Sequence, residues 1–364
     1  MKDPRSNLRN QVLYQLDEIL FLVISAVVSG ANDWDEIALF AEAKVDWLRK
    51  FFPFENGTPC DTTLSRLFAK IDPTVFNEHF SEWINTLHEV TAGAVVAFDG
   101  KTIRGSYTHL DKKTALHIVS AFVCEQQLCL GQKVVDEKSN EITAIPQMLD
   151  LLTLKGCIVT IDAMGCQKAI VQKIRKGEAD YILQVKGNQK SLLEQVEKVF
   201  SITELSDEHT SHTLDHGRVE ERTCEVIENM AHLDDCQDWQ DLTTLVRIRS
   251  TRIHKHNGKE EKSTRYYISS RSDSAENFNG YIRSHWAIEN KLHWSLDVTF
   301  KEDSSRKRIG NSAANFNIVS KMAMTMINKS DARKSPSKPW SKKKKRSKAA
   351  YSDKFREDVL KSAF

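Results

Sequence analysis

Apolar residues recur at helical spacing through the first quarter of the chain. The pattern is clearest over residues 12–28 and again over residues 34–40, where apolar positions fall on one side of a 3.6-residue turn. Asn32 or Asp33 is placed to cap the second helix, because a short polar side chain accepts a hydrogen bond from a free helix N–H group. Residues 1–92 are therefore predicted to form a helical accessory domain.

One part of this region, residues 19–28, is apolar throughout. It is too short to span a bilayer, and it lacks the basic start and the cleavage pattern of a signal peptide. The segment is better explained as a buried helix. We therefore expect no membrane partner and a cytoplasmic protein.

The pattern changes to short β-type runs after residue 93. Three runs are followed by alternating helices and strands, which predicts a mixed sheet covered by helices, an α/β fold. Asp99 ends the first strand of this series and Asp162 ends the fourth. The predicted elements are strands at 94–98, 116–124 and 128–135, a helix at 142–154, a strand at 157–161, a helix at 166–176 and a strand at 181–185.

The stretch at about 200–272 is charged and β-rich, with alternating runs at 218–227 and 245–253. Its turn signal at residues 256–259, around Asn257-Gly258, favours a hairpin. We interpret this stretch as an insertion between the fifth strand and a later helix. The catalytic domain would then span residues 93–330.

Charge is balanced over the whole chain but not along it. The 52 basic and 50 acidic residues leave a formal charge of +2, yet residues 333–348 hold nine Lys or Arg and no acid. Such a run is either a solvated tail or a segment that binds nucleic acid phosphates. We interpret residues 331–364 as a basic C-terminal tail. Seven scattered cysteines without a C-x-x-C pair argue against a disulfide framework or a structural zinc site.

Residues 283–297 carry the densest polar chemistry of the chain. A regular helix there places His285, Glu289 and His293 on one face. A carboxylate between two imidazoles suits a metal or phosphate site, whereas the alternative is a core helix with satisfied polar groups. A zinc site would need a third convergent ligand, and the helix lacks the H-E-x-x-H arrangement.

Asp99 and Asp162 change the balance between these alternatives. Strand-ending Asp residues are common turn formers, but adjacent central strands would bring these two together at one edge of the sheet. Carboxylates gathered in a cleft hold hard divalent cations such as Mg²⁺. With Glu289 added from a later helix, the three acids predict a divalent-metal site.

Five motifs together identify a family resemblance. They are Asp99-Gly-Lys-Thr, Asp162-Ala-Met-Gly-Cys-Gln, Lys186-Gly-Asn-Gln, His216-Gly-Arg218 and the stretch from His285 to Val298. In combination they resemble the H-repeat-associated insertion-sequence transposase family of the DDE superfamily. The resemblance extends from the helical N-terminal segment to about residue 348.

This resemblance implies a ribonuclease-H-like mixed-sheet core, interrupted by the β-rich insertion and preceded by the helical domain. It implies that Asp99, Asp162 and Glu289 are catalytic and bind two Mg²⁺ ions, with Mn²⁺ as an alternative. The implied partners are double-stranded DNA, as element ends and target, and a second copy of the chain on that DNA. The implied location is cytoplasmic and nucleoid-associated in a bacterium.

Related transposases often carry Tyr and Arg on the helix before the Glu and a Lys after it. Here these positions hold Ile282, His285 and Leu296, while Tyr281 and Arg283 are displaced. For the remaining polar residues near the motifs, the alternatives to DNA contact are surface exposure or core packing. The residues predicted to contact DNA are Lys101, Arg104, Lys186, Asn188, Gln189, Arg283, His285, Trp286, Asn290, His293 and Trp294.

The leading functional hypothesis is a DNA transposase that performs metal-dependent phosphodiester cleavage and strand transfer at the ends of an insertion element. Two metals can activate the attacking hydroxyl and stabilise the departing oxygen. Two alternatives remain open: a decayed or domesticated DNA-binding protein without catalysis, and a metal-dependent nuclease outside transposition.

Overall fold

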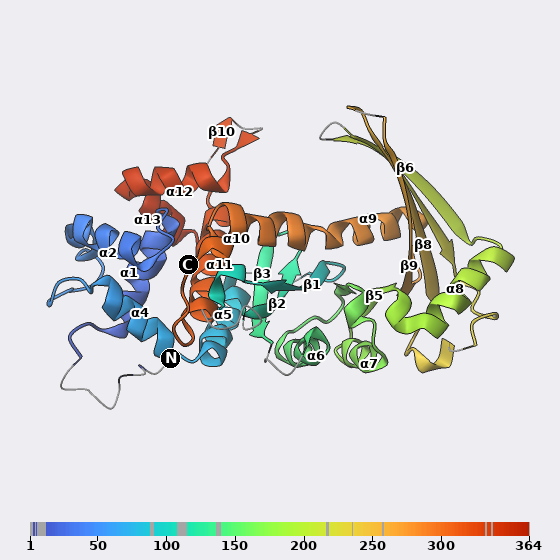
Figure 1. The fold of residues 1–364 in the computed structure, drawn as a ribbon, viewed down its shortest axis with the longest axis horizontal. Coiled ribbons are helices and arrows are strands. Elements are labelled where there is room, and N and C mark those ends of the chain that lie inside the picture. Colours follow the sequence, from blue (N-terminus) through green and yellow to red (C-terminus); the bar gives the residue numbers. More distant parts are fainter. Residues whose placement is uncertain are drawn as a thin grey trace.

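The computed structural model shows an elongated molecule, with helices at one end, a sheet in the middle and long strands at the other end (Figure 1). The first and the last helices of the chain both lie in the helical half (Figure 1). The residues described are 3, 5, 12–87, 91–107, 115–135, 140–215, 218–234, 236–256, 258–331, 333–335 and 338–363.

The N-terminal segment is helical, as its periodicity predicts. Asp33 is the cap of the second helix, and its carboxylate accepts a hydrogen bond from the backbone N–H of Glu36 at 2.8 Å. Within the described ranges, no helix combines the length and hydropathy that crossing a membrane requires. The helices are α1 (Leu16–Val28), α2 (Trp34–Ala43), α3 (Val45–Leu48), α4 (Asp61–Lys70) and α5 (Pro73–Leu87).

The central sheet has the predicted order of elements. Strands β3, β2 and β1 are antiparallel, whereas β1, β4 and β5 are parallel, with α6 and α7 as connections. This is the mixed α/β arrangement of a ribonuclease-H-like core. The elements are β1 (Val95–Thr102), β2 (His117–Val123), β3 (Leu128–Val134), α6 (Glu141–Leu151), β4 (Ile158–Ile161), α7 (Lys168–Lys176) and β5 (Asp180–Val185).

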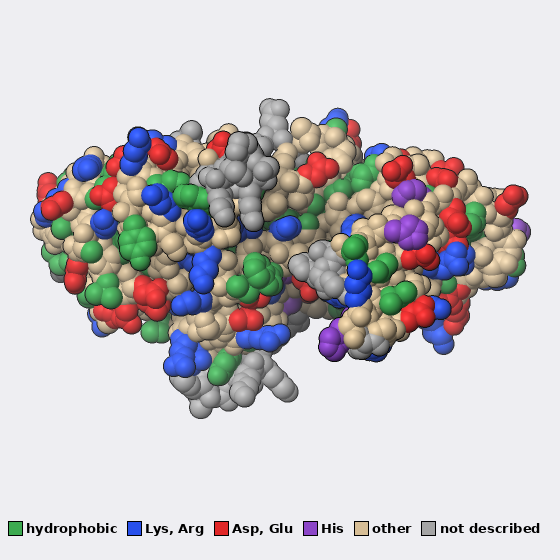
Figure 2. Space-filling view, turned by 90° about the horizontal axis from the view of Figure 1, so that it is seen from above, with side chains coloured by type: hydrophobic (Ala, Val, Ile, Leu, Met, Phe, Trp, Pro, Cys, Tyr) green, Lys and Arg blue, Asp and Glu red, His purple; other side chains and the backbone are tan. Residues whose placement is uncertain are grey.

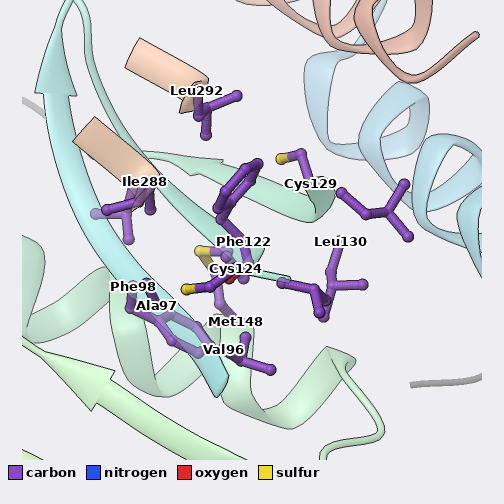
Figure 3. Packing of buried hydrophobic residues seen from close by; sticks show 14 of the residues in the cluster. Val96, Ala97, Phe98, Phe122, Cys124, Cys129, Leu130, Met148, Ile288 and Leu292 are labelled. Carbon is purple, nitrogen blue, oxygen red and sulfur yellow. The ribbon is translucent and has the colours of Figure 1, made fainter. Parts of the chain in front are cut away.

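One boundary differs from the prediction. Strand β1 does not end at Asp99 but continues to Thr102, because its pairing with β2 continues beyond the last pair with β4. The sheet interior is apolar, and Cys124 and Cys129 pack there among hydrocarbon side chains (Figure 3). These thiols therefore behave as small hydrophobic groups, as the sequence indicates.

The insertion extends the core sheet. Its last strand, β9, pairs antiparallel with β5, so the described strands form one nine-stranded sheet in the order β3-β2-β1-β4-β5-β9-β8-β7-β6. Helix α8 and strand β6 were not predicted, and Asn257 of the predicted turn lies outside the described residues. The elements are α8 (Lys190–Ile202), β6 (Asp207–Asp215), β7 (Arg218–Ile227), β8 (Thr244–His254) and β9 (Glu260–Ser269).

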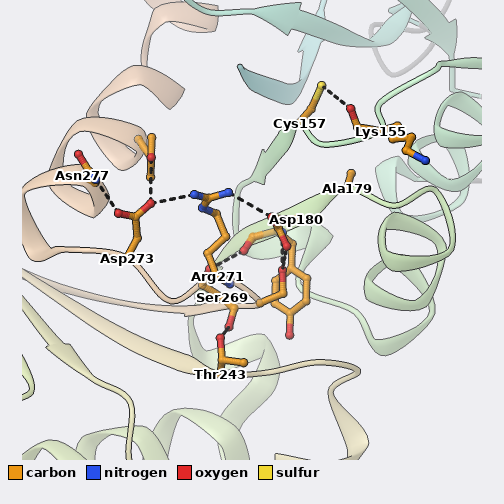
Figure 4. A network of polar contacts seen from close by, with 12 residues as sticks. Lys155, Cys157, Ala179, Asp180, Thr243, Ser269, Arg271, Asp273 and Asn277 are labelled. Carbon is orange, nitrogen blue, oxygen red and sulfur yellow. Dashed lines mark hydrogen bonds and ion pairs between the residues drawn. The ribbon is translucent and has the colours of Figure 1, made fainter. Parts of the chain in front are cut away.

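After the insertion, α9 (Ala275–His285) runs back across the core, followed by the π-helix η7 (Ile288–His293) and by α10 (Trp294–Val298). A polar network fixes the start of α9 (Figure 4). Arg271 donates to Asp180 of β5 at 3.2 Å and to Asp273 at 2.9 Å. Asp273 also accepts a hydrogen bond from the hydroxyl of Tyr281 at 3.0 Å. The helix is therefore anchored to the strand that joins core and insertion.

The C-terminal segment corrects the prediction of a basic tail. After α11 (Ser312–Lys329) and the short strands β10 (Arg333–Ser335) and β11 (Lys338–Pro339), the chain forms α12 (Lys342–Tyr351) and α13 (Asp353–Lys361). Both last helices pack against α1 and α11 beside the N-terminal helices (Figure 1). The basic run is therefore part of a folded helix, in which Lys345 and Arg346 are buried.

Candidate active site

Asp99 and Asp162 lie side by side at one edge of the central sheet. Phe98 and Ile161 form the last residue pair of the parallel strands β1 and β4. Asp99 directly follows Phe98, and Asp162 directly follows Ile161. Asp162 also accepts a hydrogen bond from the backbone N–H of Met164 at 3.0 Å. The prediction that adjacent strands bring these two acids together is confirmed.

Glu289 reaches the same place through an irregular helix. The sequence predicts a regular α-helix over residues 283–297, but the structure widens into a π-helix at residues 288–293. Ile288 and Leu292 of this π-helix are buried and point towards the aromatic rings of the sheet (Figure 3). Their burial holds Glu289 at the rim of the sheet edge. π-Helical turns occur often at functional sites.

The three acids line one pocket of about 200 Å³, which we call the acidic pocket. Thr160, His285 and Trp286 also contribute to its walls. Strands β1, β4, β5 and β9 contribute to its lining, as do η7 and the end of α9.

The carboxylates of the pocket repel one another. Burial, and then the nearby charges of Glu141, Asp162 and Glu289, together raise the pKa of Asp99 to about 7. The pKa of Asp162 is also raised, first by burial and then by Glu141, while the hydrogen bond from Met164 and the charge of Lys186 partly oppose this shift. The site thus concentrates negative charge beyond what the fold itself neutralises.

Glu141 is an acidic residue of this site that sequence reasoning missed. It is the first residue of α6, and its Oε1 lies 2.8 Å from Nε2 of His117. His117 in turn lies 2.9 Å from the hydroxyl of Thr102 through Nδ1. Gly100 leaves room for this pair, because a Cβ there would collide with the Glu141 carboxylate. The sequence does show an acid in the first turn of the helix after the third strand. An acid is common at that position in any helix, because it interacts favourably with the helix dipole.

The two histidines of the helix are neutral at pH 7. Burial lowers the pKa of His285 to about 4, and its Nδ1 lies 2.9 Å from the hydroxyl of Thr160. Burial, and then the positive charges of Lys321 and Lys101, lower the pKa of His293 to about 3. His293 Nδ1 lies 3.4 Å from Asp99 Oδ2, and this contact is therefore not an ion pair. Neither histidine therefore neutralises the carboxylates of the pocket, although His285 is part of its lining.

The donor chemistry of the pocket fits a hard divalent cation, since every acidic group offers oxygen. Among the residues that the structure describes, however, no three His, Cys, Asp or Glu side chains are close enough together to form a ready-made metal site. Burial and the neighbouring carboxylates both disfavour the charged form of Asp99 and raise its pKa. A cation would relieve the repulsion by drawing the carboxylates together.

Several residues predicted to contact DNA do lie at the pocket or beside it. Lys186, His285 and Trp286 line the acidic pocket. Arg283, Asn290 and Trp286 line a second cavity next to it. Trp286 is thus common to both.

Other predicted contacts use their polar groups within the chain. The Lys101 ammonium is paired with Asp297 and Glu302. Asn188 Nδ2 donates to the carbonyl of Ala163 at 2.6 Å, and Gln189 Nε2 donates to that of Cys166 at 2.9 Å. These side chains support the loops around Asp162.

Two further residues lie away from the walls of both cavities. Arg104 is 84% exposed beside Asp303, and Trp294 is 58% exposed. His216 lies outside the described residues. Ile282 and Leu296 are buried, so packing explains the apolar residues at those helix positions.

The charge of the pocket predicts a pH-dependent stability in buffer free of divalent cations. An unfolded Asp has a pKa of about 3.9, whereas the pKa of Asp99 in the folded chain is about 7. The folded state therefore binds the proton more tightly, and stability is lost as pH rises from about 4 to about 7. Asp99→Asn is expected to raise the free energy of unfolding at pH 8 by on the order of 3 kcal/mol, and to have little effect at pH 4.

Urea unfolding of both proteins at the two pH values measures this difference. The control is Asp46→Asn, which removes a carboxylate that is 96% exposed and should change the free energy of unfolding by no more than about 0.5 kcal/mol. Equal stability of Asp99→Asn and the wild type at pH 8 would show that the pocket does not strain its carboxylates.

Comparison with known proteins places this geometry in context. Residues 91–326 match the family described as "Transposase DDE domain", and residues 1–84 match the family described as "DDE_Tnp_1-associated". The first match covers the whole acidic pocket, and the second covers the N-terminal helices.

Curated relatives are similar over most of their length. "Putative transposase YncI" of Escherichia coli O157:H7 is 43% identical over 330 residues, which are 89% of this chain and 85% of the relative. "H repeat-associated putative transposase YhhI" of Escherichia coli K12 is 42% identical over 327 residues, 87% of this chain and 86% of the relative. Among solved structures, a piggyBac transposase synaptic complex with hairpin DNA matches with a TM-score of 0.46 and 11% identity, covering 98% of this chain and 77% of that chain.

Proposed function

The chain belongs to the transposase DDE domain family, and from this premise we propose that its acidic pocket cuts DNA at the ends of an insertion element and joins the freed ends to target DNA. One observation carries the proposal. The register of β1 and β4 sets Asp99 beside Asp162, and the π-helix brings Glu289 to the same pocket.

The pocket needs positive charge before it can accept its substrate. A phosphodiester is anionic, and the carboxylates of the pocket would repel it. We propose that Asp99, Asp162 and Glu289 hold two Mg²⁺ ions, or Mn²⁺ in their place, with Glu141 as a neighbouring carboxylate. When bound, such cations activate a water or 3′-hydroxyl nucleophile and stabilise the departing oxygen.

The side chains of the pocket provide orientation and exclude water. The neutral imidazole of His285 is held by Thr160 and packs beside the acids. Ile282 and Ile288 make the roof apolar, which strengthens electrostatic interactions inside. Lys186, whose charge acts on Asp162, is placed to contact a phosphate oxygen. Trp286 is 39% exposed and offers a ring on which a base could stack.

The test uses purified full-length protein, Mg²⁺ and a DNA duplex that carries the terminal repeats flanking the coding region. We expect strand breaks at the repeat ends and joined products with a target plasmid. Removal of divalent cations with EDTA should stop both reactions, and Mg²⁺ should restore them. The joining of two ends in one complex favours a homodimer on DNA, which light scattering of the complex would detect.

Two outcomes would replace the proposal. Salt-sensitive DNA binding without breaks under any divalent cation would favour a DNA-binding protein without catalysis. Breaks at positions unrelated to the repeats would favour a nuclease outside transposition.

A further inference from the structure

A second cavity, of about 540 Å³, opens beside the acidic pocket and shares Trp286 and Glu289 with it. It lies between the insertion strands and the helix that carries Glu289, where β6–β9 rise beside α9 (Figure 1). We call it the arginine groove, after four residues of its lining. These are Arg218 and Arg222 of β7, Arg252 of β8 and Arg283 of α9.

The charge of the groove is opposite to that of the pocket. Together with Lys291, the four arginines give the groove five cationic side chains. Its lining contains two carboxylates, those of Glu220 and Glu289. Glu220 is occupied by Arg252 at 2.9 Å and by Arg283 at 3.8 Å. The face shown in Figure 2 carries both basic and acidic side chains. The groove is therefore a local concentration of positive charge.

Arg222 is a buried cation in the wall of the groove. Its side chain is only 3% exposed, and its Nε donates to Asn279 Oδ1 at 2.6 Å. Asn279 is itself held by a hydrogen bond of 3.0 Å to the hydroxyl of Ser211. Within the described part of the chain, the Nη2 of Arg222 has no hydrogen-bond partner. A buried guanidinium with an unused donor is costly to keep, and an acceptor in the groove would satisfy it.

A phosphodiester backbone fits this arrangement best. Guanidinium groups match two phosphate oxygens at once, and the groove presents several of them in succession across β7, β8 and α9. Trp286 lies at the junction of groove and pocket, with the Arg265 guanidinium stacked on it at 5.2 Å. A chain of phosphates lying in the groove would thus lead directly to Glu289.

We propose that the arginine groove binds the phosphates of the DNA strand next to the bond that the acidic pocket cuts. This inference rests on the proposed function and names the surface that positions its substrate. The insertion thereby supplies the positive charge, and the core supplies the carboxylates.

The test compares Arg252→Met/Arg283→Met with Arg249→Met. Arg252 and Arg283 are 37% and 47% exposed, so their replacement should not prevent folding. Arg249 is a matched control, because it lies on the same strand, faces the other side of the sheet and is 54% exposed. Binding of a fluorescent duplex carrying the element end is measured by anisotropy in EDTA, over a range of salt concentrations.

We expect the double variant to bind roughly 100-fold more weakly, about tenfold for each lost charged contact, and its salt dependence to fall by about two counterions. Arg249→Met should bind like the wild type. Glu220→Gln removes a competing carboxylate and should tighten binding. Because Arg222 is buried, Arg222→Lys is a supporting variant that keeps the charge but removes the unused donor, and it should also weaken binding.

The experiments distinguish an error in the groove inference from an error in the proposed function. If the wild type cuts DNA at the repeat ends but the double variant binds like Arg249→Met, or Glu220→Gln binds more weakly, the groove inference is overturned and the function stands. A thermal shift without DNA gives an independent check. Inorganic sulfate should raise the melting temperature of Arg249→Met more than that of the double variant, and an equal rise would also count against the groove.

Discussion

Asp99→Asn, Asp162→Asn and Glu289→Gln are each expected to lower the rate of DNA cleavage by at least about a thousandfold, because groups that act as one unit lose most of their effect together. For the same reason, combining two of these changes should cost little more than one. The structure motivates this expectation by gathering the three carboxylates in one pocket. Cleavage is measured on the element-end duplex under single-turnover conditions.

Binding measurements distinguish a variant that no longer cleaves DNA from one that no longer binds it. Each variant should bind the duplex at least as well as the wild type in EDTA, since a carboxylate that repels phosphate has been removed. Titration calorimetry should show weaker Mg²⁺ binding. Asp46→Asn, at an exposed position on α3, controls for the loss of a carboxylate elsewhere. Cleavage by Asp99→Asn at the wild-type rate would exclude the acidic pocket as the catalytic centre.

Arg346→Ala is expected to lower the free energy of unfolding by on the order of 4 kcal/mol, because it leaves several buried acceptors unsatisfied. Arg346 belongs to the basic run but is only 4% exposed. Its guanidinium donates to the carbonyls of Val27 at 3.0 Å and Ala31 at 2.9 Å, and also to the carbonyl of Thr299. It thereby ties α12 to the end of α1 and to the segment after α10.

Lys343→Ala is the matched control for this prediction, since Lys343 is an exposed member of the same run. It should change the free energy of unfolding by less than about 0.5 kcal/mol. Urea denaturation of both variants gives the comparison. Equal stability of the two would mean that the packing of α12 contributes nothing to the fold, and would restore the interpretation of a solvated tail.

The core sheet was largely predictable because its signals are local. Runs of apolar residues predicted the strands. The order of strands and helices then predicted which strands are neighbours in the sheet. That was enough to expect Asp99 beside Asp162. The register of β1 with β4 confirms that the two residues follow directly after paired positions on neighbouring strands.

Glu141 and the arginine groove were not predictable in the same way. Glu141 joins the site only because α6 packs beside β1 and Gly100 leaves room for its carboxylate. Arg222 and Arg252 come from two strands of the insertion, and they share a cavity with α9 because β9 pairs with β5. Such contacts depend on pairing between distant segments, which no local pattern encodes.

By itself, the sequence determined the α/β class, the order of the core elements, the family and the three acids of the pocket. Only the tertiary structure decided which charged residues are buried, paired or exposed. In the folded chain Arg346 is buried and Lys101 forms ion pairs with acids of the chain. Arg222 lies in the wall of the arginine groove, and one of its donors has no partner among the described residues. The physical reason is that an arginine has the same chemistry in water and in a core, and only the segments packed around it decide whether its charge is solvated, neutralised or held ready for a phosphate.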